Sequence, residues 1–266
     1  MTANDHQDLL ERLIEGINNL TTSEQWQRYL DFQGRFHNYS FGNVLLIAAQ
    51  CPEATRVAGF RAWGKLDRSV RKGEKAIWIL APMIYKVADA EEVASNRDVR
   101  GFKFVPVFDI SQTEGEGVPS VCSSLNDEDP NGLYDQLVSV AQSIGFKVDD
   151  HAFVGNINGD CCHRDHRIRI KTTNSPGQRV KTLAHEIAHA LLHQKFDDRS
   201  LAELEAESTA YVVCQALGIE SSDYSFGYVA TWAGGGEQAI AGIKASCERI
   251  QKSAVTILRA FEPAEQ

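Results

Sequence analysis

Two histidines and a glutamate stand close together in the segment His185-Glu186-Ile187-Ala188-His189. Residues four apart lie on the same face of a helix, one turn above each other, so His185 and His189 could bind one metal ion. Glu186 lies between them and would point along the helix toward a water molecule on that ion. The H-E-x-x-H pattern is typical of zinc-dependent hydrolases. Three fixed residues alone are weak evidence, so the flanking sequence must support the assignment.

The flanking residues predict the helix that this chemistry needs. Ser175 followed by Gln178 forms a capping-box pattern, and Pro176 fits the first helical position. Apolar residues recur at helical spacing on the side opposite the two histidines, namely Val180, Leu183, Ala184, Ile187 and Leu191. We therefore expect a capped amphipathic helix that presents His185 and His189 on its polar face. A surface helix with solvated histidines is the alternative.

A catalytic zinc usually has three protein ligands and an open fourth position. His193 continues the four-residue step, but eight residues of helix span about 12 Å. Metal–ligand bonds of about 2 Å require ligand atoms only a few Å apart. We therefore expect His193 to be a polar residue at the helix end, and the third ligand to come from another element.

The next predicted helix, residues 201–214, offers three glutamates. On a helical wheel, Glu203 and Glu207 fall within or beside the apolar side, whereas Glu205 points away and is expected to be solvated. Carboxylates on an inward face are costly unless they bind a metal or are paired. We favour Glu203 as the third ligand, with Glu207 as the alternative. If Glu203 ligates, Glu207 would hydrogen-bond the free ring nitrogen of a ligating histidine. A capping box from Ser200 to Glu203 is the structural alternative.

This set of residues predicts peptidase chemistry. Zn²⁺ held by His185, His189 and Glu203 would lower the pKa of its water and polarise a substrate carbonyl. Glu186 would take the proton from that water and deliver it to the leaving amine. Zinc is therefore the expected cofactor, and a protein or peptide is the expected substrate.

The bulk composition is that of a soluble globular protein, with 43% hydrophobic and 24% charged residues in 266. No apolar run approaches membrane-spanning length, and the N-terminus lacks signal-peptide features. We expect a cytoplasmic protein with no membrane partner, in which the six cysteines are reduced. Cys161 and Cys162 lie near His163 and His166 in the sequence, so they are candidate ligands of a second metal site. Neighbouring strand residues point to opposite faces, however, so that site is not favoured.

The organisation of the chain predicts an α+β fold with two domains. A stretch rich in Gly, Ser, Asp and Glu gives the boundary, so that residues 1–115 form one domain, 116–132 a linker and 133–266 a second domain. The first domain is expected to hold helices at 9–17, 22–36 and 40–49 and strands at 76–81 and 102–108. The second is expected to hold a helix at 133–144, a hairpin within 153–171, the H-E-x-x-H helix, the 201–214 helix and a final helix at 237–261.

Charge is distributed unevenly along the chain. Residues 20–86 carry ten basic and five acidic residues, a net charge of +5, while the remainder carries 17 basic and 31 acidic residues, a net charge of −14. Regions of opposite sign indicate two functions. Aromatic residues interleave with the basic ones, a combination used by single-strand nucleic-acid binders. The alternative is that most of these aromatics are core residues, which we prefer for Trp26, Tyr29 and Trp78.

Several motifs resemble those of the ArdC-type antirestriction proteins of mobile elements. They occupy residues 36–47, 54–60, 70–77 and 107–115. That family pairs a single-stranded-DNA-binding domain with a C-terminal zincin-like metallopeptidase domain. The C-terminal half resembles the ImmA/IrrE-type metallopeptidases, whose third ligand begins an E-x-x-A-[EN] run. That run corresponds to Glu203, with Glu207 at its last position.

The resemblance implies a zinc metallopeptidase with a single-stranded-DNA-binding domain and an antirestriction or DNA-linked regulatory role on a mobile element. The alternative is a non-catalytic binder with structural zinc, which shields single-stranded DNA or mimics DNA through its acidic half. Glu186 favours the enzyme, since a structural site needs no general base. The residues expected to contact DNA are Arg35, Tyr39, Asn43, Arg61, Trp63, Lys65, Arg68, Arg71, Lys72 and Lys75.

Overall fold

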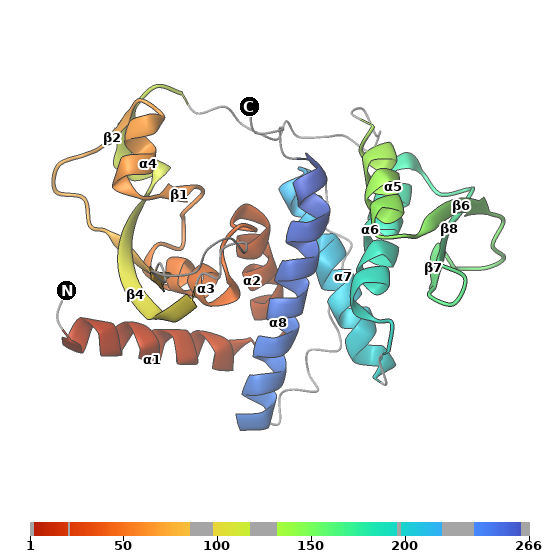
Figure 1. Ribbon diagram of the computed structural model, residues 1–266, viewed down its shortest axis with the longest axis horizontal. Coiled ribbons are helices and arrows are strands. Elements are labelled where there is room, and N and C mark those ends of the chain that lie inside the picture. Colours follow the sequence, from red (N-terminus) through yellow and green to blue (C-terminus); the bar gives the residue numbers. More distant parts are fainter. Residues whose placement is uncertain are drawn as a thin grey trace, which may run out of the picture. The chain divides into compact units, whose positions relative to one another are not determined.

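The structure, a computed structural model, describes residues 3–20, 22–85, 98–117, 132–195, 198–219 and 237–261 (Figure 1). It contains both helices and strands, so the predicted α+β class is confirmed. The chain divides into two compact units. Unit 1 comprises residues 1–16 and 42–119, and unit 2 comprises residues 17–41 and 120–266. None of the described helices is long and apolar enough to cross a membrane.

Unit 1 contains an antiparallel sheet of strand order β1–β4–β3 and a separate antiparallel pair, β2–β5. The sheet buries Ile77, Ile79 and Val107 on one face. The elements are α1 (Ala3–Asn19), α3 (Phe41–Gln50), β1 (Val57–Ala58), α4 (Phe60–Lys65), β2 (Arg68–Val70), β3 (Ile77–Tyr85), β4 (Asp98–Asp109), η1 (Ile110–Gln112) and β5 (Thr113–Gly115).

Two side-chain amides of α3 pair with the backbone of β3. Asn43 donates to the Leu80 carbonyl at 2.9 Å and accepts from the Leu80 amide at 2.8 Å. Gln50 makes the same pair of bonds with Trp78, both at 2.9 Å. The amides thus satisfy backbone groups at the strand edge, which would otherwise lack a protein partner. Asn43 is buried in this role, so its expected contact with DNA is not supported.

Unit 2 combines a small sheet with a group of helices. The strand order is β6–β8–β7, in which β6 is parallel and β7 antiparallel to β8, so that β7 is an edge strand. The elements are α2 (Ser23–Arg35), α5 (Leu133–Ser143), β6 (Lys147–His151), β7 (Gly159–Cys162), β8 (Arg167–Lys171), α6 (Pro176–Leu192), α7 (Arg199–Ala216), α8 (Glu237–Leu258) and η3 (Arg259–Phe261). The predicted hairpin is therefore confirmed as β7–β8, whereas β6 was not predicted.

Helix α7 contacts α6, α8 and α2 (Figure 1). Its buried residues accordingly surround the helix instead of forming a single stripe. Glu205 is one of them and has 0% exposure. The expectation that Glu205 is solvated is wrong, because the wheel assumed one buried face and α7 has more than one.

Helix α2 belongs to unit 2, although the predicted domain 1–115 included it. Thr22 caps it by accepting from the Gln25 amide, as the capping pattern predicts. Trp26 is fully buried and donates its indole N–H to Ser208 Oγ at 3.0 Å, which ties α2 to α7. The assignment of Trp26 and Tyr29 to the core is confirmed. Most of the predicted linker, residues 118–131, lies outside the described residues.

Candidate metal centre

Helix α6 begins as the sequence predicts. Ser175 is the N-cap and accepts from the Gln178 amide at 3.3 Å, and Pro176 is the first helical residue. The apolar side is buried through Val180, Leu183, Ala184 and Ile187. This packing fixes the rotation of the helix, so that His185 and His189 share the opposite face with their Nε2 atoms 3.0 Å apart.

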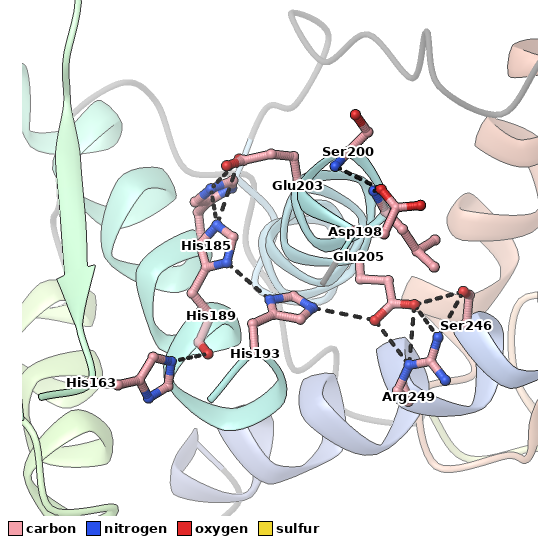
Figure 2. A network of polar contacts seen from close by, with 11 residues as sticks. His163, His185, His189, His193, Asp198, Ser200, Glu203, Glu205, Ser246 and Arg249 are labelled. Atoms are coloured by element: carbon pink, nitrogen blue, oxygen red, sulfur yellow. Dashed lines mark hydrogen bonds and ion pairs between the residues drawn. The ribbon is translucent and has the colours of Figure 1, made fainter. Parts of the chain in front are cut away.

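Glu203 of α7 completes the cluster. Its Oε2 lies 3.4 Å from His185 Nε2 and 3.6 Å from His189 Nε2. One donor atom from each of the three residues lies within 4.8 Å of the others. The N-cap of α7 is Asp198, whose carboxylate accepts from the Ser200 and Leu201 amides. The capping box from Ser200 is therefore not formed, and the Glu203 carboxylate is directed at the histidines (Figure 2).

Glu207 lies one turn beyond Glu203 and contacts the other ring nitrogen of His185. Its Oε2 is 3.0 Å from His185 Nδ1. A carboxylate at that position favours the tautomer with a proton on Nδ1, which leaves the Nε2 lone pair directed at the cluster. Glu203 and Glu207 thus have different partners on the same imidazole.

The electrostatics of the cluster fit a cation. Burial opposes the charged form of His185, but hydrogen bonds to Glu203 and Glu207 outweigh it and raise the pKa of His185 to about 10. The same histidine contacts hold the pKa of Glu203 well below its ordinary value. The raised pKa of His185 reflects an excess of carboxylates over positive charges around its ring. A divalent metal ion would satisfy the same carboxylates and imidazoles.

Glu186 is buried, with 6% exposure, and its carboxylate lies beside Gly159 of strand β7. Burial, assisted by the charges of Asp160 and Glu203, raises its pKa to about 7, against the opposing effect of His185. A Cβ placed on Gly159 of β7 would lie 3.1 Å from Glu186 Oε1 and 2.6 Å from Thr182 Cγ2. Only glycine lets the edge strand pass this close to α6.

Two pockets meet at this point. One, of about 350 Å³, is lined by Asn158, Gln178, Lys181, Thr182 and Glu207. The other, of about 380 Å³, is lined by Asp160, Cys161, His163, His189, His193, Arg199 and Glu203. Gly159, His185 and Glu186 line both. The candidate general base therefore lies where the two pockets join, beside the edge strand.

His193 is absent from the donor cluster, as the helix geometry requires. Its side chain is only 5% exposed, and its Nδ1 lies 2.9 Å from His189 Nδ1. Its Nε2 lies 3.3 Å from Oε2 of the buried Glu205 (Figure 2). The sequence analysis did not predict the contact between His193 and Glu205. The four-residue spacing from His189 to His193 was the feature that could have indicated that the two rings meet.

The sequence around Cys161 does not form a second metal cluster among the residues that the structure describes. Cys161 and Cys162 are free thiols on β7. The ring of His163 instead contacts the His189 carbonyl oxygen at 3.0 Å, at the C-terminal end of α6.

The residues expected to contact DNA are divided between the two units. Arg35 and Tyr39 lie in unit 2 and the other eight in unit 1. Trp63 is fully buried and donates its indole N–H to the Phe108 carbonyl at 2.9 Å, so its expected contact with DNA is not supported.

Two of the basic residues have partners within unit 1. Arg68 donates to Thr113 Oγ1 at 2.8 Å, and Arg71 donates to Glu74 and to the Ser111 carbonyl. These contacts explain their positions without a nucleic acid. Four cations of unit 1 remain as exposed candidates, namely Arg61, Lys65, Lys72 and Lys75.

Comparison with known proteins matches two parts of the chain to families. Residues 3–108 match the N-terminal domain of anti-restriction factor ArdC. Residues 146–217, which include the donor cluster, match the M78 peptidase family described as the IrrE N-terminal-like domain. The resemblance drawn from the sequence motifs is therefore confirmed.

Solved structures and one curated relative agree with these matches. The metal-free antirestriction ArdC protein of plasmid R388 is 21% identical with a TM-score of 0.53, and covers 84% of this chain and 85% of that chain. The Mn(II)-bound structure of that protein is 20% identical with a TM-score of 0.56, over 97% and 98%. An uncharacterized protein of Bacillus anthracis, pXO2-81, is 25% identical over 86% of this chain. The chain spans about half of that relative, 47% of its length.

Proposed function

We propose that the chain is a zinc metallopeptidase with a single-stranded-DNA-binding domain, because its two parts match the ArdC N-terminal domain and the IrrE N-terminal-like domain. Its proposed role is antirestriction or DNA-linked regulation on a mobile element. The observation that carries the peptidase proposal is the convergence of His185, His189 and Glu203 beside the buried Glu186.

Zn²⁺ is the proposed cofactor. Two imidazoles and one carboxylate are a common ligand set of catalytic zinc, with a fourth position left for water or substrate. One of the solved ArdC structures is Mn(II)-bound, which supports a divalent cation. The metal would supply Lewis acidity toward a water molecule and a substrate carbonyl.

Glu186 is the proposed general base and acid. A carboxyl whose pKa is about 7 is able both to accept a proton near neutral pH and to release it in a later step. Its burial keeps bulk water from competing for that proton. It would take the proton from the attacking water and deliver it to the leaving amine.

The proposed substrate is an extended protein or peptide segment. Strand β7 is at the edge of its sheet, next to Glu186, and an extended segment could add to such an edge by backbone hydrogen bonds. The pockets that meet at Gly159 would then receive side chains on the two sides of the cleaved bond.

The test is Glu186→Gln, with Glu248→Gln on the exposed surface of α8 as a matched control. We expect the Glu186 variant to keep zinc and DNA binding and to lose cleavage, measured by comparing cleaved proteins in cells that produce each variant. If Glu186→Gln keeps full biological activity, the protein is instead a non-catalytic binder with structural zinc.

The DNA-binding part of the proposal is supported by the family match and by the exposed cations of unit 1. A fluorescent single-stranded oligonucleotide should bind, more weakly as salt rises and more tightly than a duplex. Equal affinity for duplex, or none for either, would contradict the assignment.

A further inference from the structure

The two histidines of the cluster differ in what holds their outer ring nitrogens. His185 Nδ1 meets the carboxylate of Glu207 directly, at 3.0 Å. Among the residues that the structure describes, His189 Nδ1 meets no carboxylate directly. It lies 2.9 Å from Nδ1 of His193, whose Nε2 lies 3.3 Å from the carboxylate of Glu205 (Figure 2).

The number of protons available determines which atom donates in each of these contacts. The Nδ1 atoms of His189 and His193 lie at hydrogen-bond distance, and His193 is outside the donor cluster, so one Nδ1 donates a proton and the other accepts it. Glu205 accepts from Arg249 through Nε at 2.9 Å and from Ser246 Oγ at 2.6 Å, the pattern of an ionised carboxylate. An ionised carboxylate only accepts, so His193 must donate to it through Nε2.

The donor role of His193 determines which nitrogen of His189 carries a proton. With His193 donating to Glu205 through Nε2 and accepting at Nδ1, His189 carries its proton on Nδ1. The Nε2 atom of His189, which faces His185 and Glu203, is then left with the lone pair that a metal requires.

We propose that His193 and Glu205 are positioning residues that fix the tautomer and ring orientation of the metal ligand His189, with Arg249 and Ser246 of α8 holding Glu205. The proposal rests on metal ligation by His189 under the proposed function. It assigns the ion pair between the buried Glu205 of α7 and Arg249 of α8 a role that goes beyond joining two helices.

A pair of substitutions separates the two hydrogen bonds of His193. In His193→Asn the amide overlaps the Nδ1 position, and its oxygen could accept from His189 but would not reach Glu205. In His193→Gln the longer amide could donate to Glu205 but leaves His189 Nδ1 without its acceptor. His193→Phe keeps the ring and removes both bonds.

The experiment measures Zn²⁺ affinity by competition with a chromogenic chelator, the visible spectrum of the Co²⁺-loaded full chain, and thermal unfolding of each metal-free variant. We expect His193→Asn to bind Zn²⁺ within a few-fold of wild type. The Gln and Phe variants should lose about 10- to 100-fold and show altered Co²⁺ bands. Equal affinity of Asn and Gln variants, or tighter binding by Gln, would overturn the proposal.

A second measurement needs no variant. Imidazole ¹⁵N shifts of the Zn²⁺-loaded wild type should place a proton on Nδ1 of His189 and on Nε2 of His193, and a proton on His193 Nδ1 would overturn the assignment.

His189→Ala distinguishes failure of the proposed metal site from failure of the positioning role. If it leaves Zn²⁺ affinity unchanged, the metal site itself is wrong. If it abolishes binding while His193→Gln does not weaken it, only the positioning role fails.

Discussion

Glu207 Oε2 lies 3.0 Å from His185 Nδ1, while Nε2 of the same ring lies 3.4 Å from Glu203. Under the proposed function, Glu203 ligates the metal and Glu207 orients the ligand His185. We expect Glu207→Gln to lower Zn²⁺ affinity by roughly 10- to 100-fold, the loss typical when a residue that orients a ligand is changed. Glu203→Gln should lower Zn²⁺ affinity by more than that. Chelator competition on both variants checks the order. A larger loss for Glu207→Gln would exchange the two roles.

The sequence could predict the parts of the site that depend on one helix. The spacing of His185, Glu186 and His189 and the capping of α6 by Ser175 follow from local periodicity. The position of Glu203 does not follow from the wheel, which placed it within or beside the apolar side, because its side chain is 51% exposed. The role of Glu205 could not be predicted in the same way. It depends on Arg249 and Ser246 of α8, which lie more than forty positions further along the chain. The residue spacing of α7 does not show that α8 packs against it.

The packing partner of α2 is also absent from its local sequence. Its capping and periodicity define the helix but not its partner, and α2 packs on α7 across an interval of 182 residues from Trp26 to Ser208. A boundary drawn from composition near residue 115 therefore assigned residues 17–41 to the first domain, whereas the contacts group them with unit 2.

Two fully buried tryptophans, one in each unit, provide a test of that grouping. Trp26 lies in unit 2 and Trp63 in unit 1, both with 0% exposure. Substitution of either by Ala should lower the free energy of unfolding by about 3–5 kcal/mol. We expect only Trp26→Ala to weaken Zn²⁺ retention on heating, because only that change loosens the unit that holds the cluster. Zinc release followed with a fluorescent chelator during thermal unfolding checks this. Earlier release from Trp63→Ala alone would contradict the grouping.

Gly159 is predicted to tolerate no side chain. A Cβ there would meet Thr182 Cγ2 at 2.6 Å and the Arg169 carbonyl at 3.0 Å, so Gly159→Ala should destabilise unit 2 by about 1–3 kcal/mol and displace β7 from Glu186. Adding Thr182→Ser removes the nearest methyl group and keeps the hydroxyl that accepts from Gln178. The double variant should recover part of the lost stability in urea unfolding. Simple additivity of the two single changes would count against this contact as the cause.

The exposed lysines of unit 1 are predicted to act differently from the arginines beside them. Lys72 and Lys75 are exposed, so replacing either by Ala should reduce the slope of log affinity against log salt for single-stranded DNA by about 0.7 for each phosphate that is no longer neutralised. Lys244→Ala on α8 is the control and should leave the slope unchanged. Arg68→Ala should instead lower the melting temperature of unit 1, because it removes bonds to Thr113. Oligonucleotide titrations at several salt concentrations distinguish these outcomes.

Asp109 is predicted to stabilise unit 1 at neutral pH. Its buried carboxylate accepts from the amides of Thr55, Arg56 and Ser111 at 2.8–2.9 Å. Burial alone would raise the pKa of Asp109, but these hydrogen bonds outweigh it and hold the pKa below the ordinary value of 3.8. Because the folded value is the lower one, the stabilisation is present above pH 3.8 and is lost as the pH falls through the folded value.

Asp109→Asn should therefore destabilise unit 1 by about 2 kcal/mol at pH 7, because an amide nitrogen would then face the Ser111 amide. The difference between wild type and variant should shrink as the pH falls below 3.8. Asp67→Asn is the matched control, since Asp67 is exposed and its left-handed backbone, at φ 54°, suits asparagine equally well. Urea unfolding of the three proteins between pH 3 and pH 7 measures the effect. A difference that stays constant across that range would show that the hydrogen bonds to the Asp109 carboxylate are not what stabilises the turn.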